Sequence, residues 1–132
     1  MSADARPRDR GAASLALVIT LVATLAGAGL IVDGGRAMVA RRHASNFAEA
    51  AARAGVATAR PDEPLDPLRA RAAVYFAAAV EGVPPTDLRI VVSDDVVEVT
   101  VTERRPTVFL VLGGRSTLTV RATGRARLHF SG

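Results

Sequence analysis

The stretch that decides the fold is Ala12–Val32, "AASLALVITLVATLAGAGLIV", which carries no charged side chain over 21 residues. As a helix rising about 1.5 Å per residue it would be about 31 Å long, close to the thickness of about 30 Å of a bilayer's hydrocarbon core. The hydroxyls of Ser14, Thr20 and Thr24 can bond back to helix carbonyls, so they are compatible with lipid. The stretch predicts one transmembrane helix.

Three fates compete for this N-terminal region. It can be a retained anchor, a prepilin-type leader cut between Gly11 and Ala12, or a secretory signal cut after Ala28, where residues 26–28 read Ala-Gly-Ala. The apolar run continues through residues 30–32, past the last of these sites, and is longer than the signal-peptide core of about 7–15 residues. We therefore favour a retained anchor.

Charge alone does not fix the orientation of the span, because arginines stand on both sides of it: Arg6, Arg8 and Arg10 before, and Arg36, Arg41 and Arg42 after. The segment before the span is a short tail, whereas the segment after it is long enough, at about a hundred residues, to form a domain. We therefore take the longer segment to be the exported one. We expect residues 1–11 to form a cytoplasmic tail, 12–32 to cross the cell membrane, and 33–132 to form an extracytoplasmic domain.

The helix is expected to continue beyond the span as a stem. Asp33, Gly34 and Gly35 mark the membrane exit, and the glycine pair lowers helix propensity by about 2 kcal/mol relative to alanine, which predicts a hinge. A narrow stripe of small residues then recurs every three or four positions: Ala37, Ala40, Ala44, Phe47, Ala51 and Ala54. This stripe can pack on the chain's own domain or against neighbouring subunits, because alanine lets helices approach closely.

A second helix is predicted after the proline-rich loop at residues 59–67. Asp66 and Pro67 form an N-cap and first helical residue, and Gly82 ends the helix after Val80. Apolar residues spaced four apart form a stripe along one side of this helix: Leu68, Ala72, Phe76 and Val80.

From Leu88 onward the apolar residues alternate with polar ones, which predicts strands. A first strand around 88–92 and a second around 97–101 are joined by a turn at Asp94 and Asp95. Residues 106–112, "PTVFLVL", fit a buried strand or a short helix equally well. The alternation from 117 to 130 predicts a long last strand. We expect an α+β fold: a transmembrane helix continuing into an Ala-rich stem, a short helix, and an antiparallel sheet of about three strands.

The basic residues suggest one candidate binding face. The formal net charge is +4, and six arginines but no acidic residue lie between Arg104 and Gly132. Alternation puts Arg121, Arg125 and Arg127 on the wet face of the last strand. This face is either simply solvated or a site for an anionic partner such as a cell-wall polymer.

No residue pattern predicts catalysis. The chain has no Cys, and His43 and His129 have no partner at metal-ligand spacing. No phosphate-loop motif follows the glycine pairs, and the few aromatic residues do not fit single-stranded nucleic acid. We therefore expect no enzyme activity, metal, cofactor, nucleic acid or small-molecule substrate.

The segment "DRGAASLALVITLVATLAGAGLIVDGGRAMVARRHASNFAEAAARAG", residues 9–55, resembles the N-terminal region of TadE/TadG-like proteins of the Flp (tight adherence) pilus system. The matching features are Arg10-Gly11 before a small-residue start, the single span, the Asp33-Gly34 exit and the Ala-rich helix. "PTVFLVLGG" and "STLTVRATGRARL" are similar to the C-terminal part of TadE-like proteins. The resemblance implies a non-catalytic, pilin-like envelope protein, either a minor pseudopilin or an assembly accessory. It would meet lipid and other pilus or secretion-platform proteins through its span and Ala-rich helix.

One position departs from the family pattern. Pseudopilins of this family that are cut by prepilin peptidase carry a Glu five residues after the cleavage glycine, and Ala16 stands there. This favours an intact anchor over cleavage between Gly11 and Ala12. The alternatives are a stand-alone membrane-tethered domain that binds anionic wall polymer, and a protein secreted after a cut at Ala28.

Overall fold

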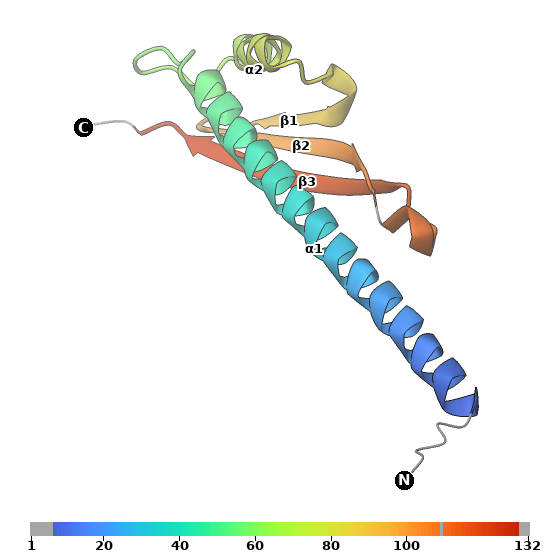
Figure 1. Ribbon diagram of the computed structural model, residues 1–132. Coiled ribbons are helices and arrows are strands. Elements are labelled where there is room, and N and C mark those ends of the chain that lie inside the picture. Colours follow the sequence, from blue (N-terminus) through green and yellow to red (C-terminus); the bar gives the residue numbers. More distant parts are fainter. Residues whose placement is uncertain (1–6, 109, 130–132) are drawn as a thin grey trace.

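One long helix, α1, carries the rest of the molecule on its second half (Figure 1). The structure is a computed structural model that describes residues 7–108 and 110–129. A short helix and a three-stranded antiparallel sheet pack on α1, which confirms the predicted α+β class and order of elements. The elements are α1 (Pro7–Val56), α2 (Pro67–Glu81), η1 (Pro85–Asp87), β1 (Leu88–Val92), β2 (Val96–Pro106), η2 (Leu110–Gly113) and β3 (Thr117–Arg127).

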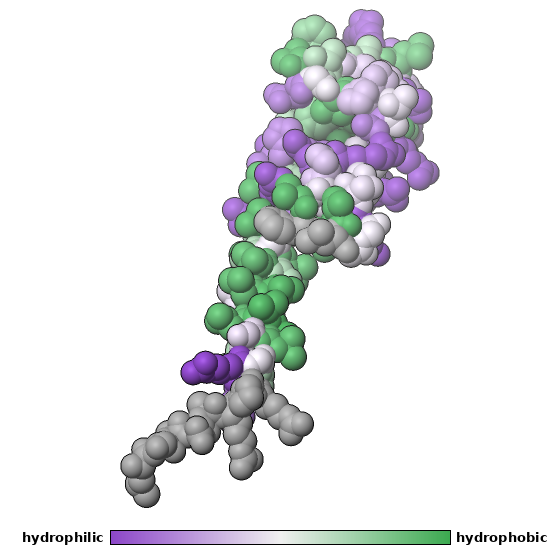
Figure 2. Space-filling model, turned by 45° about the vertical axis from the view of Figure 1, so that its right-hand side comes forward, coloured by the Kyte–Doolittle hydropathy of each residue, from purple (hydrophilic) through white to green (hydrophobic). Residues whose placement is uncertain are grey.

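The first half of α1 projects from the packed part and is covered with apolar side chains (Figure 2). By length and composition this part is long and apolar enough to cross a membrane. The hydroxyls of Ser14, Thr20 and Thr24 donate to the carbonyl four residues earlier, at 2.8–3.0 Å, as expected for polar groups in an apolar helix. Large side chains remain exposed from Leu15 to Val32, so this half has no protein core of its own.

The second half of α1 lies across one face of the sheet. Its buried residues are nearly all alanines: Ala40, Ala44, Ala48, Ala51 and Ala52. At Gly124 of β3 the approach is so close that an added Cβ would lie 2.2 Å from the carbonyl carbon of Ala48. The Ala-rich stripe therefore packs on the chain's own domain, which decides between the two roles left open by the sequence.

The helix α1 continues without interruption through Asp33, Gly34 and Gly35. An added Cβ at either glycine would meet nothing within 4 Å, so neither is required there by close packing. The structure contains one continuous helix here, so a hinge at these residues stays a prediction.

The sheet has the order β1-β2-β3, with Ile90 and Gly124 on either side of Val99. Val97, Val99 and Val101 of the central strand are buried against both helices. On the opposite face the hydroxyls of Thr100 and Thr123 lie 3.0 Å apart. That face is largely polar, and among the described residues no helix lies on it (Figure 1).

Helix α2 begins and ends where the sequence predicts, but it turns its larger apolar side outward. The Asp66 carboxylate accepts from the Leu68 N–H at 2.9 Å, and Gly82 ends the helix in the left-handed conformation at φ 72°. The buried residues are Ala70, Val74 and Ala78. The stripe predicted to share one side does so, and its large members are exposed: Leu68 at 81%, Phe76 at 73% and Val80 at 70%.

The segment at residues 106–112 is not a separate strand. Strand β2 runs as far as Pro106, and a single 3-10 turn, η2, occupies Leu110–Gly113, with Phe109 outside the described residues. Of the two possibilities left open by the sequence, the short helical turn is the one observed.

Candidate functional site

A buried polar contact joins α1 to the connection between β2 and β3. We call residues 107–114 the β2–β3 tip. Asp33 is buried, at 4% exposed, and its carboxylate accepts backbone hydrogen bonds from the tip, among them those of Val108 and Leu110. The N–H of Val108 donates to Oδ1 at 3.2 Å and that of Leu110 to Oδ2 at 2.8 Å. These residues are 75 or more positions apart in sequence, so Asp33 fastens the sheet to the helix.

The tip needs such an acceptor because a short helical turn leaves the N–H groups at its start unpaired. Other bonds close the tip from within. The N–H of Thr107 donates to the Ser116 carbonyl at 3.1 Å, and that of Arg115 donates to the Leu110 carbonyl at 2.9 Å. Gly114 turns the chain back at φ 85°, a conformation that favours glycine. The Asp33 carboxylate then satisfies the start of η2.

The tip reaches along α1 toward the apolar half of the helix. Gly29, one turn before Asp33, is also buried. In Figure 1, η2 lies beside the middle of α1, where the projecting half begins. Val108 and Val111 of the tip are each 50% exposed. An apolar tip thus lies next to the last turn of the predicted span.

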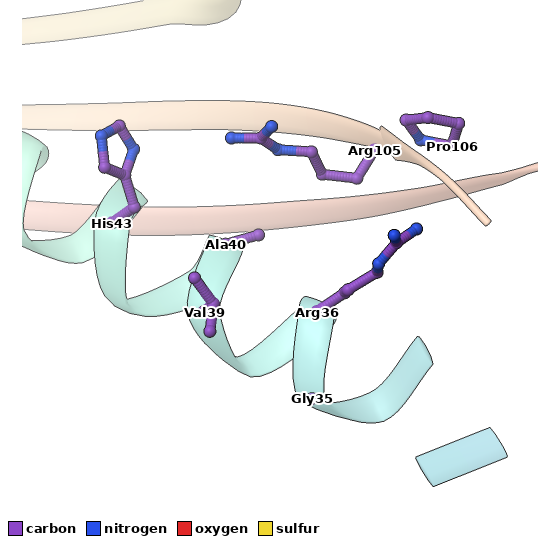
Figure 3. A pocket seen from close by; sticks show the side chains of 7 residues that line it. All are labelled: Gly35, Arg36, Val39, Ala40, His43, Arg105 and Pro106. Carbon is purple, nitrogen blue, oxygen red and sulfur yellow. The ribbon is translucent and has the colours of Figure 1, made fainter. Parts of the chain in front are cut away.

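A hollow of about 490 Å³ opens beside this junction, between α1 and the end of β2 (Figure 3). Arg36 and Arg105 enter it from the two elements, and Val39 and Pro106 contribute apolar walls. Arg105 is partly neutralised, because its Nε donates to Glu103 Oε1 at 2.6 Å. The hollow is therefore apolar in its walls and basic at its edges.

A second hollow, of about 500 Å³, lies between α1 and α2. Phe47, Phe76 and Val80 line it, so it continues the exposed stripe of α2. An exposed apolar surface of this kind on a protein outside lipid is a common mark of an interface.

The structure places Arg121, Arg125 and Arg127 on one exposed face of β3, as the alternation predicted. Acidic groups lie close to two of them. Arg127 Nε is 3.4 Å from Asp95 Oδ2, and Arg125 stands opposite Glu98 in the strand register. These neighbours reduce the local positive potential, and binding of an anionic partner by this face stays a prediction.

The predicted cleavage positions lie on α1. Gly11 and Ala12 are exposed in its first turns, and Ala28 lies one residue before the buried Gly29. Cleavage at either place stays a prediction.

In the described part of the chain, neither histidine belongs to a cluster of three or more possible metal ligands. His43 Nδ1 is 3.8 Å from Glu103 Oε2, and His129 is exposed. Within residues 7–108 and 110–129, no group of three or more His, Cys, Asp or Glu side chains could hold a metal ion.

A family match falls on the long helix. Residues 11–59 match the Tad family, described as putative Flp pilus-assembly TadE/G-like. This confirms the resemblance predicted for the N-terminal region. The Tad match begins at Gly11 and ends just after α1, so it covers the apolar segment and the stem, whereas α2 and the sheet lie outside it. No curated protein and no solved structure gives a significant match. The match and the helix together support a protein related to pilus assembly.

Sequence reasoning named Asp33 as the membrane exit but missed its contact with the tip. The sequence offered only a partial signal: one acidic residue directly after 21 uncharged ones, and a distant uncharged, largely apolar segment at residues 106–114. Only the chain's topology shows that the two meet.

Proposed function

We propose that this chain is a membrane-anchored, non-catalytic protein of a Flp-type pilus assembly or a related secretion machine, acting as a minor pseudopilin or an accessory. One observation carries the proposal: the Tad match at residues 11–59 falls on a single helix that is apolar and exposed in its first half and packed on a small domain in its second. That is the arrangement expected of a pilin-like subunit, in which lipid or a filament core receives the first half.

In this proposal residues 12–32 cross the cell membrane, residues 1–11 remain in the cytoplasm, and residues 33–132 form the extracytoplasmic domain. The exposed apolar side chains of the first half of α1 support a location in lipid, because water would make their exposure unfavourable by about 25 cal/mol per Å². Reaction of single cysteines with a membrane-impermeant reagent in whole cells tests the orientation. Val91→Cys should react and Ser2→Cys should not; the opposite pattern would reverse the topology.

The anchor is proposed to remain intact, since Ala16 occupies the position where cleaved family members carry Glu. Sequencing the N-terminus of the mature protein distinguishes the alternatives directly. A chain that starts at Met1 or Ser2 supports the retained anchor. A start at Ala12 shows prepilin-type processing, and a start at Gly29 shows a secreted protein.

Other pilus components would meet the span and the exposed stripe of α2. The Ala-rich stripe of α1 is not free for them, because its own sheet covers it. Phe76→Asp should reduce co-purification with the platform or pilin proteins without destabilising the domain, because Phe76 is 73% exposed. Val91→Asp, on the open face of the sheet, is the matched control and should leave co-purification unchanged.

The decisive test of the proposal is genetic. A clean deletion should abolish or strongly reduce Flp-type pili, and the wild-type chain supplied in trans should restore them. Normal piliation in the deletion strain would overturn the proposed function.

A further inference from the structure

Among the described side chains of the β2–β3 tip, two apolar ones, Val108 and Val111, are left half-exposed by the domain. The sequence of the tip with the flanking proline, "PTVFLVLGG" at residues 106–114, contains no charged residue. Val108 and Val111 are 50% exposed although they stand in a turn that is closed by internal hydrogen bonds. Neither valine is buried by the domain, so both are available to contact something outside it.

The position of the tip relative to α1 is fixed by hydrogen bonds. Asp33, which holds Val108 and Leu110, is the first residue after the apolar run at 12–32. The buried Gly29 lies about 6 Å further into that run, at about 1.5 Å per residue. Figure 2 shows the hydrophobic surface of the projecting helix continuing up to the base of the packed part. If residues 12–32 fill the hydrocarbon core, the tip lies at its outer boundary.

Two arginines flank the tip, one on α1 and one where the chain leaves the tip. Arg36 follows Asp33 by about one helical turn, and Arg115 closes the tip. Arg41 and Arg121 border a further hollow on the other side of α1. Within residues 7–108 and 110–129, neither Arg36 nor Arg115 forms an ion pair, and both are exposed. Apolar side chains with unpaired arginines beside them match the boundary where acyl chains meet lipid phosphates.

We propose that the β2–β3 tip is a second membrane contact: Val108 and Val111 enter the outer boundary of the acyl chains, while Arg36 and Arg115 bind phosphates of lipid headgroups. The inference rests on the proposed membrane span and deepens it. With two contacts on one membrane, joined through Asp33, the domain is held at a fixed height and angle above the bilayer instead of swivelling on α1.

The absence of Cys from the sequence makes a direct depth measurement possible. The full chain, carrying one cysteine labelled with an environment-sensitive fluorophore, is reconstituted into vesicles that contain phosphatidylglycerol and a lipid with a quencher near the top of its acyl chain. Val111→Cys reports on the tip, Leu25→Cys on the span, and Val91→Cys on the open face of the sheet.

The expected result is strong quenching at Val111, several-fold greater than at Val91. Strong quenching at Leu25 by a quencher placed deep in the acyl chain should accompany it. Quenching at Leu25 with none at Val111 would overturn the tip contact while leaving the anchor intact. An unquenched Leu25 would overturn the anchor of the proposed function, and the inference with it.

The headgroup contact has its own measurement. Replacing phosphatidylglycerol by phosphatidylcholine should move the Val111 label outward, and Arg36→Gln together with Arg115→Gln should remove this dependence on lipid charge. Arg89→Gln, on the open sheet face, is the control and should preserve it. A Val111 label that is shielded in cells but not quenched in vesicles would show that a protein covers the tip, and would overturn the lipid assignment.

Discussion

The two helices of the packed domain both bury small residues, but they differ in their phenylalanines: Phe47 of α1 is buried, whereas Phe76 of α2 is exposed. On α1 the buried face is built mostly from alanines, among them Ala44 and Ala48, whereas on α2 the large residues Leu68 and Phe76 are exposed. The face that is buried is therefore the face that allows the closest approach, not the one with the most hydrophobic surface. Close approach gains dispersion contacts over many atoms, which a few large side chains at a wider separation would not supply. The large residues of α2 then remain available for a partner.

The largest expected effect comes from adding one methyl group where α1 and β3 are in closest contact. In Gly124→Ala the new Cβ would overlap the backbone of Ala48 at 2.2 Å, and backbone cannot rotate away. We expect a loss of at least about 3 kcal/mol, beyond the usual range of overpacking, and unfolding of much of the domain. The loss is measured as the urea concentration at which the protein in detergent loses half of its protection from a protease. Gly113→Ala, which meets nothing within 4 Å, is the control; equal midpoints for the two variants would refute the close approach.

A second pair of variants compares the two sides of α2 directly. Val74→Ala removes a fully buried side chain and should lower the free energy of unfolding by about 2 kcal/mol. Phe76→Ala removes a much larger side chain, yet it should change stability by less than about 0.5 kcal/mol because that side chain is exposed. The same urea titration measures both. If Phe76→Ala proved the more damaging, α2 would pack with its other side inward.

Near Asp33, α1 is joined to the β2–β3 tip by hydrogen bonds and not by alanine packing. The variant Asp33→Asn tests that contact. The amide cannot accept from both Val108 and Leu110 N–H groups as the carboxylate does. We expect a local loss of about 1–3 kcal/mol, seen as faster hydrogen exchange at these two amides. Asp87→Asn, which breaks an exposed ion pair with Arg104, should leave their exchange unchanged. Unaltered exchange in Asp33→Asn would mean that the tip is held by other contacts.

A last variant tests a glycine for which close packing gives no reason. Gly34 lies in α1 and, unlike Gly124 of β3, has open space around it. Gly34→Ala should therefore stabilise the helix by about 1 kcal/mol through propensity alone. Slower hydrogen exchange of the amides of residues 31–38 in Gly34→Ala would show this stabilisation. Such a result would mean that the glycine pair weakens the helix, as a hinge requires. Unchanged exchange would remove the argument for a hinge.

The sequence by itself determined the elements and the apolar segment. The 21 uncharged residues predicted a helix that could span a membrane, and Asp66 and Gly82 predicted both ends of α2. Alternation predicted the last strand and the shared face of Arg121 and Arg125. These features are local, because they depend on periodicity and on capping groups a few residues apart.

Only the tertiary structure decided which apolar face is buried and what Asp33 holds. Periodicity shows that residues share a side of a helix, but it does not show which side has a sheet beside it. That depends on contacts between distant parts of the chain, such as Gly124 with Ala48 and Leu110 with Asp33. The free energy of these contacts comes from the fit of two surfaces, and neither surface is encoded within one stretch of sequence.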